Sequence, residues 1–501
     1  MQILKDWLQF GRGAATPDLT ALPEEWTPPH PDTDPVTVVE NLREQLAQQF
    51  AQRANPHARI KWLELCHAEL LLRLPKIERE ISLSTLPLEG RPLQTALSSD
   101  NLIKAMAGGY ILVLEALRTQ KVLASQSPLI RLAALRAVQL LGQRQKLACL
   151  AYAPASANTW QQIHGIYAYA TSQGVDLFSH HDRTLEASYL EALLLAYANP
   201  TQFSRVEIPA LIACINHFSH HARIIKPSAD KVRSRAVFMV AHNDTQAGRR
   251  ALLHLDEVEH SAWLVDCSHL VAIMSEVIQQ RLAGTRSPND DGQTPDSVLR
   301  DAFTAWRGPR ARRFARQSFK PRGELVLGMG ALHAALASDT VDEGSEWTIL
   351  DESPDGFGLR LARGNVKGIQ VGELVGMRPR ERETLHVCLI RRVVYGGASR
   401  LEMGVQEVGP VAHPLTLTIE QNRPVPALFF PTLPAYRNVP GLMIEAHTAE
   451  PGDPIRTPTG QLLTVSRPLE QDHRYQLWEL TSLPFDDGVP RTDTPPTPPI
   501  R

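Results

Sequence analysis

The feature that most constrains the fold is a change in the spacing of apolar residues part-way along the chain. From about residue 36 to residue 282, apolar residues recur at the three- and four-residue spacing of amphipathic helices. From about residue 345 they alternate instead, in short runs such as EWTILDE, FGLRLAR and HVCLIRRVVY separated by glycine-containing turns. These two periods belong to different secondary structures, so we predict a multidomain α + β protein with a helical N-terminal domain followed by antiparallel β structure.

Proline-rich and polar segments divide the chain further. Dense prolines favour a leader or linker at the start and a disordered tail at the end, and AGTRSPNDDGQTPDS is typical of a linker. The predicted organisation is a leader over 1–35, a helical domain over 36–282, a linker over 283–302, a β-barrel domain over 303–412, a second β module over 413–484 and a tail over 485–501.

Two helices stand out within the first domain. In IRLAALRAVQLLGQ the apolar residues approximate a stripe, with Arg131, Arg136 and Gln139 between them. In LEASYLEALLLAYANP the pattern ends at Asn199-Pro200, where proline forbids continuation of the helix.

Composition excludes several classes of protein. The formal net charge is −2 over 501 residues, so any anion site must be local. Five scattered cysteines with no C-x-x-C spacing predict reduced thiols and no disulfide framework. Lys5 and Asp6 interrupt the first apolar run, and no uncharged apolar stretch reaches about 18 residues, so we expect no signal peptide, no transmembrane helix and a cytoplasmic protein.

A local anion site is indicated by residues 307–322, RGPRARRFARQSFKPR, which carry seven positive side chains and no acid. Downstream, DESPDGFG has D-x-S-x-x-G spacing directly after the strand-like EWTIL. Arginine binds phosphate oxygens in pairs and matches the O6/N7 edge of guanine, whereas aspartate accepts from N–H groups. Together the two segments predict a site for a guanine nucleotide with more than one phosphate.

RRFAR followed by DESPDG resembles the R-x-x-x-R and [D/N]-x-S-x-x-G pair of the PilZ domain, the bacterial receptor module for cyclic di-GMP. The runs VKGIQVGELVGMRPR and HVCLIRRVVYGGASRLEMGVQEV resemble the strands that follow the motif in that family, with Gly404 in its L-G-V position. The resemblance covers roughly residues 303–412. It implies a six-stranded antiparallel barrel that binds the ligand on its surface. The arginine-bearing segment would then wrap over the bound ligand.

The resemblance also implies a role for each motif residue. Arg312 and Arg316 would grip phosphate and guanine. Asp351 and Ser353 would hydrogen-bond the ligand, and Gly356 would shape the turn. The ligand-binding residues implied in this way are Arg312, Arg313, Arg316, Asp351, Ser353 and Gly356.

Arg313 enters this set through a departure from the family pattern. Position 311 is alanine, whereas family members that bind an intercalated ligand dimer often have arginine there. Arg310 or Arg313 would have to take that place, which leaves the ligand stoichiometry open.

Other interpretations of the same residues remain. The arginines could coat a solvated surface, with Asp351 and Ser353 in an ordinary turn. They could also bind nucleic acid, although few aromatic residues interleave with them and no other basic stripe supports this. A structural adaptor with a degenerate barrel that binds no ligand is the alternative from a different class.

No catalytic or metal-binding constellation is predicted. His217 and His221 are four residues apart, but no glutamate in H-E-x-x-H spacing lies between them, and Cys267 and His269 lack a third partner. We therefore expect a receptor, not an enzyme, with cyclic di-GMP as its ligand and no cofactor. We also expect a protein partner at the helical domain and no stable nucleic-acid binding.

Overall fold

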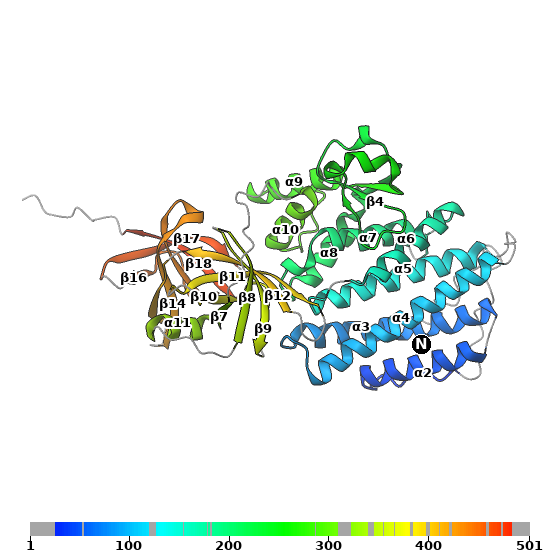
Figure 1. Ribbon diagram of the computed structural model, residues 1–501, viewed down its shortest axis with the longest axis horizontal. Coiled ribbons are helices and arrows are strands. Elements are labelled where there is room, and N and C mark those ends of the chain that lie inside the picture. The colour runs from blue at the N-terminus through cyan, green and yellow to red at the C-terminus, as the bar shows by residue number, and fades with distance from the viewer. Residues whose placement is uncertain are drawn as a thin grey trace, which may run out of the picture. The chain divides into compact units, whose positions relative to one another are not determined.

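The computed structural model describes residues 26–52, 55–119, 127–153, 155–177, 179–180, 183–285, 287–308, 322–338, 345–353, 355–364, 366–380, 384–396, 401–409, 411–419, 423–456, 460–471 and 474–482. A mainly helical region precedes a region of longer strands along the chain (Figure 1). The first of two compact units contains residues up to 322 together with 344–371 and 390–406. The second contains 323–343, 372–389 and 407 onward.

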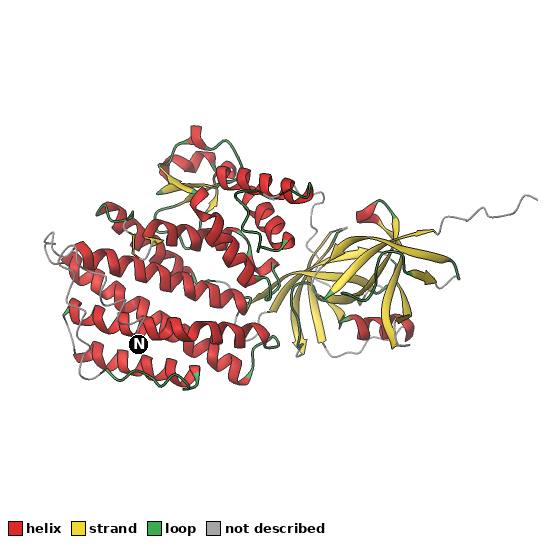
Figure 2. Ribbon diagram, turned by 180° about the vertical axis from the view of Figure 1, so that it is seen from behind, coloured by secondary structure: helices red, strands yellow, loops and turns green. Residues whose placement is uncertain are grey.

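The N-terminal part of the first unit is a bundle of helices (Figure 2). It contains α2 (Pro35–Gln52), α3 (Pro56–Leu83), α4 (Gly90–Thr119), α5 (Ser127–Leu150), α6 (Ala157–Ser172), α7 (Leu185–Tyr197) and α8 (Ile208–Phe218), with the short hairpin β1 (Ser179–His180) and β2 (Arg183–Thr184) before α7. The predicted end of α7 is confirmed, since a 3-10 turn begins at Pro200.

Local side-chain caps explain where several of these helices begin. Asn55 accepts a hydrogen bond from His57 N at 2.9 Å, and Pro56 opens α3, where its missing N–H costs nothing. Ser156 caps α6 through Thr159 N at 3.3 Å. Such caps supply partners to backbone donors that the helix itself leaves unpaired.

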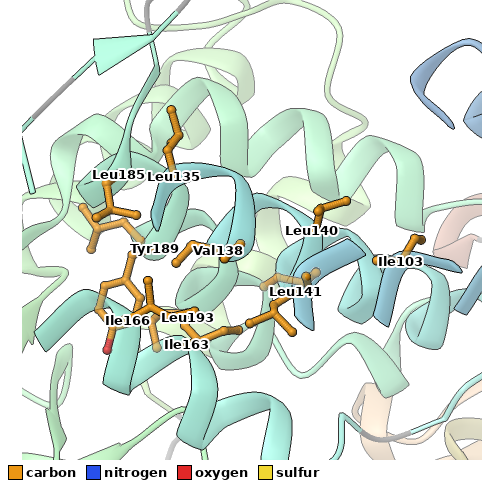
Figure 3. Packing of buried hydrophobic residues seen from close by; sticks show 14 of the residues in the cluster. Ile103, Leu135, Val138, Leu140, Leu141, Ile163, Ile166, Leu185, Tyr189 and Leu193 are labelled. Carbon is orange, nitrogen blue, oxygen red and sulfur yellow. The ribbon is translucent and has the colours of Figure 1, made fainter. Parts of the chain in front are cut away.

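The apolar stripe of α5 packs against α6 and α7 (Figure 3). Val138, Ile163 and Leu193, one from each helix, are completely buried. Leu135 and Leu141 lie along the same core. This packing, more than intrinsic helix propensity, holds the bundle together.

One arginine of α5, which lies at a polar position between the apolar residues of the stripe, is buried. Arg136 is only 6 % exposed, and its Nη2 donates to Glu64 Oε2 of α3 at 3.1 Å. Tyr110 of α4 donates to the other oxygen of the same carboxylate. Burial opposes the charged form of Arg136, but the neighbouring Glu64 carboxylate raises its pKa overall. A buried ion pair therefore links three helices.

A small antiparallel sheet that the sequence patterns did not predict follows α8. Its strand order is β3 (Arg223–Ile225), β6 (Trp263–Asp266), β4 (Val237–Val240) and β5 (Arg249–Arg250). Helices α9 (Ser268–Leu282) and α10 (Asp296–Arg307) come next, so α10 begins inside the predicted linker. The strands are two to four residues long, and β4 is buried at every position. Neither their length nor an alternation of apolar and polar residues therefore identified them in the sequence.

The predicted antiparallel barrel is confirmed. Its strands close in the order β10–β11–β12–β9–β8–β7. They are β7 (Arg322–Leu327), β8 (Ser345–Ser353), β9 (Gly356–Gly364), β10 (Leu374–Pro379), β11 (His386–Tyr395) and β12 (Leu401–Gly409), and α11 (Met329–Ser338) follows β7. The sequence GELVLGMGALHAALA favours a helix over a strand, but its first five residues form most of β7 and only its later residues form α11.

The second β module is a six-stranded antiparallel sheet within the second unit. Its order is β13 (His413–Ile419), β14 (Arg423–Leu433), β15 (Val439–Glu445), β18 (Tyr475–Ser482), β17 (Leu462–Gln471) and β16 (Pro454–Arg456). Phe430 and Leu477 share an apolar cluster with Leu332 of α11 and Leu374 of β10. The buried Glu373 accepts from Tyr475 Oη at 2.7 Å. The module therefore shares its core with α11 and β10.

The five cysteines are free, as predicted, and all five are buried. Burial raises the pKa of Cys66, Cys149 and Cys214 to about 12. Thiols in such surroundings are inert packing groups.

Among the described helices, none has the length and apolar character needed to cross a membrane.

Candidate ligand-binding site

The predicted motif corner lies where β8 meets β9. Asp351 and Ser353 are at the end of β8, and Gly356 begins β9. Ser353 pairs with Gly356 across the hairpin, and its Oγ donates to the Gly356 carbonyl at 3.3 Å. Asp351 pairs with Gly358. The structure therefore brings all three motif residues of this corner together.

A β-bulge decides which face Asp351 and Ser353 occupy. Up to Ile349 the odd-numbered residues of β8 are buried, and Ile349 pairs with the buried Leu359. The register then shifts by one residue, so Asp351 pairs with Gly358. Because side chains alternate along a strand, the extra residue moves Asp351 and Ser353 to the outer face.

Gly356 is the residue that lets this corner approach the neighbouring strand. Its φ is +143°, and a Cβ atom there would lie 2.0 Å from the carbonyl oxygen of Val405 on β12 and 2.9 Å from the Cα atom of Gln406. Such contact with backbone cannot be relieved by a side-chain rotation. The last position of the motif therefore requires glycine for steric reasons.

Two further glycines lie beside the corner on the outer face. Gly358 of β9 pairs with Asp351 on one side and with Gly404 of β12 on the other. A Cβ atom at Gly358 would lie 2.6 Å from Oδ1 of Asp351. The carboxylate thus lies over the Gly358 backbone, in a position that a side chain at residue 358 would block.

Several charged groups on these strands already have partners. Arg322 Nη1 lies 2.8 Å from Glu346 Oε1, and Arg360 Nη2 lies 2.8 Å from Glu402 Oε1. Arg391 Nε donates to the Gln406 side chain at 2.8 Å. These exposed or half-exposed pairs contribute at most about 1 kcal/mol each, and they occupy charges that could otherwise bind an anion.

The other half of the predicted site lies outside the described residues. Arg312, Arg313 and Arg316 fall between 309 and 321. The described chain stops on one side at Gly308, after α10, and resumes on the other at Arg322, the first residue of β7. Their predicted roles therefore rest on the sequence.

Tyr152, which follows α5, joins the helical bundle to strands of the barrel within the first unit. Its carbonyl accepts from Tyr395 N at the end of β11 at 2.9 Å, and its hydroxyl accepts from Val371 N at 3.2 Å. Nearby, Gly368 N donates to Leu86 O at 2.8 Å. Burial raises the pKa of Tyr152 to about 12, so the hydroxyl stays protonated. No sequence signal marks this contact, because its partners are more than 200 residues apart.

The histidines discounted in the sequence have structural partners. His217 Nε2 lies 2.8 Å from Asn289 O, and the rings of His220 and His221 are 3.9 Å apart. Within the described ranges, no group of three or more potential ligands could hold a metal ion. Next to the buried Cys267, Ser268 Oγ lies 2.9 Å from Ser234 Oγ.

Comparison with known proteins identifies similarity in the helical part of the chain. Residues 21–229 match the family model described as "Cyclic-di-GMP receptor FimW, N-terminal domain", which is less than half of the chain. The sequence is also 26% identical over 293 residues to the cyclic-di-GMP receptor FimW of Pseudomonas aeruginosa. The predicted resemblance to a cyclic di-GMP receptor is therefore confirmed. It was inferred from the barrel, yet the family match lies in the helical part.

The alignment with the curated relative covers 56% of this chain and 47% of that protein, so it spans about half of its length. No solved structure matches the chain.

Proposed function

We propose that the chain is a receptor that binds cyclic di-GMP at the β8–β9 corner and converts binding into a changed surface on its helical domain. The observation that carries this proposal is the bulged corner, which holds Asp351 and Ser353 on the outer face against a row of glycines. Two similarities support the same ligand: residues 21–229, outside the barrel, match a family model described for a cyclic-di-GMP receptor, and the chain resembles the cyclic-di-GMP receptor FimW.

The chemistry of the corner suits half of a cyclic dinucleotide. The Asp351 carboxylate can accept from the N1–H and N2–H donors of guanine, and the Ser353 hydroxyl can donate to a phosphate oxygen. Arg312 and Arg316 would supply bidentate contacts to phosphate or to the O6/N7 edge, with Arg313 as a further cation. Each good bidentate pair contributes about 1–3 kcal/mol.

Conversion of binding into a signal would use the contacts around Tyr152. The strand that ends at Tyr395 and the loop that contains Val371 both belong to the barrel, and both donate to Tyr152. A shift at these strand ends would therefore reach the end of α5. Moving a population from 1:99 to 99:1 needs about 5.5 kcal/mol of differential binding, which a few arginine pairs can provide.

Titration calorimetry with cyclic di-GMP tests the binding site. Asp351→Ala and Arg312→Ala should each weaken binding by about ten- to a hundredfold, at about 1.4 kcal/mol per factor of ten. Arg300→Ala is the matched control, because Arg300 is exposed on α10 and pairs with Asp296 of the same helix. GTP and GMP should compete poorly, since each offers one guanine and a different phosphate geometry.

Unchanged affinity in both site variants would remove the site assignment. Absence of binding by the unmodified chain would favour the alternative, an adaptor with a degenerate barrel whose helical domain recruits a partner protein. Equal binding of GTP would indicate a general nucleotide pocket instead.

Tyr152→Phe tests the conversion step. The variant keeps the ring but removes the oxygen that accepts from Val371 N. We expect the affinity for cyclic di-GMP to change by less than about threefold, since Tyr152 is not proposed to touch the ligand. In hydrogen exchange, ligand-dependent slowing should persist in β8 and β9 but be lost around Tyr152 and Leu86. Tyr169→Phe on α6 is the control, and equal slowing in all three proteins would contradict this route.

A further inference from the structure

The row of paired residues that begins at Asp351 crosses the outer face of the barrel. It runs from Asp351 on β8 through Gly358 on β9 to Gly404 on β12. Arg392 of β11 lies beside Gly404, since a Cβ atom built there would be 3.7 Å from Arg392 Cβ and 4.0 Å from its Nε. A carboxylate, from Asp351, and a guanidinium, from Arg392, therefore flank the adjacent glycines Gly358 and Gly404.

Arg392 differs from the arginines around it in having no acidic or amide partner. Arg322, Arg360 and Arg391 each contact a carboxylate or an amide of a neighbouring strand. Arg392 is exposed, and within the part of the chain that the structure describes it forms no hydrogen bond or ion pair. A guanidinium in this state keeps all five donors for a ligand.

The two glycines hold the carboxylate and the guanidinium near each other. The Asp351 carboxylate lies over Gly358, and Arg392 lies beside Gly404 on the adjacent strand. Adjacent strands are about 4.8 Å apart, so roughly one strand spacing separates these two glycines. A planar ring could meet the two charged groups from the outer face, with one edge toward Asp351 and the adjacent edge toward Arg392.

We propose that Arg392 is a ligand-binding residue that reads the O6/N7 edge of one guanine of the dinucleotide, while Asp351 binds its N1–H and N2–H edge. This inference rests on the proposed function and adds a residue outside both sequence motifs. Guanine fits this pair because its N1–H and N2–H donors and its O6 and N7 acceptors lie on adjacent edges of the ring, so the carboxylate and the guanidinium each meet the opposite type of group. Asp351 and Arg392 then both contribute to specificity for guanine.

The test measures the affinity of four proteins for cyclic di-GMP and for its analogue with 7-deazaguanine, which lacks the N7 acceptor. The four proteins are the unmodified chain and the variants Arg392→Ala, Arg392→Lys and Arg363→Ala. Arg392→Ala should bind cyclic di-GMP at least about tenfold more weakly. Arg392→Lys should restore only part of this loss, because lysine lacks the planar fork. Arg363→Ala is the matched control, since Arg363 is also exposed but lies five residues beyond Gly358 on β9.

The analogue shows which group Arg392 contacts. The unmodified chain should prefer cyclic di-GMP over the 7-deaza analogue several-fold, and Arg392→Ala should lose this preference. If Arg392→Ala binds more weakly but keeps the preference, the arginine contacts phosphate and the assignment to the base edge is wrong. If Arg392→Ala binds as tightly as the unmodified chain, the inference fails while the proposed function stands. If the unmodified chain binds no cyclic di-GMP, the proposed function itself fails.

Discussion

Replacing Gly356 by alanine is expected to destabilise the barrel by about 2–5 kcal/mol, because the new methyl group would meet the backbone of β12. The Cβ position lies 2.0 Å from Val405 O, and φ is +143°, where residues with side chains are strained. Overpacking costs about 1–3 kcal/mol and a strained backbone conformation a similar amount. Relief requires β8 and β9 to move away from β12, which would also displace Asp351 and Ser353.

Urea unfolding measures this loss as a lower midpoint at unchanged slope. The matched control is Gly404→Ala, on the adjacent strand, where the nearest side-chain atom would be 3.7 Å away and no unusual φ is required. Gly404→Ala should change stability by less than about 1 kcal/mol. Equal midpoints for the two variants would show that the corner does not depend on close approach to β12.

Removing Arg136 is expected to destabilise the helical domain by about 3–5 kcal/mol, since it would leave the Glu64 carboxylate buried without its cation. Arg136 and Glu64 are only 6 % and 2 % exposed, and Nε of Arg136 also donates to Glu64 at 3.1 Å. Tyr110 donates to the same carboxylate and is completely buried. No water can solvate the orphaned charge without opening the packing of α3, α4 and α5.

Thermal unfolding followed by far-ultraviolet circular dichroism tests this expectation. Arg183→Ala is the control, because the Arg183–Glu191 pair leaves 46% of the arginine side chain exposed and should contribute at most about 1 kcal/mol. The double variant Glu64→Leu with Arg136→Met should recover most of the loss, since a buried pair replaced by apolar groups of similar volume is often neutral. A single Arg136→Ala variant as stable as the control would show that Glu64 finds another partner.

Some parts of the molecule were predictable because the signals are local. The end of α7 follows from Asn199-Pro200, where the proline ring blocks the next helical turn. The β8–β9 corner follows from a strand pattern that leads into D-x-S-x-x-G, where aspartate, serine and glycine each favour a turn. In both cases a few neighbouring residues contain the physical cause.

Other features were not predictable because their causes lie far apart in the sequence. Arg136 stands among polar positions of its helix, and its burial depends on Glu64, 72 residues earlier. Tyr152 gives no hint of its bonds to Val371 and Tyr395. Strand β4 is too short and too uniformly buried to display a period.

By itself the sequence determined the order of helical and β segments, the turn between β8 and β9 and the ligand class that its motifs suit, since each depends on residues within a turn or a short strand. Tertiary structure decided the rest. A one-residue register shift between Ile349 and Asp351 sets the motif side chains on the outer face, and strand pairing aligns Gly358 with Gly404 beside Arg392. Pairing and burial are interactions between distant segments, so their outcome appears only when the chain is folded.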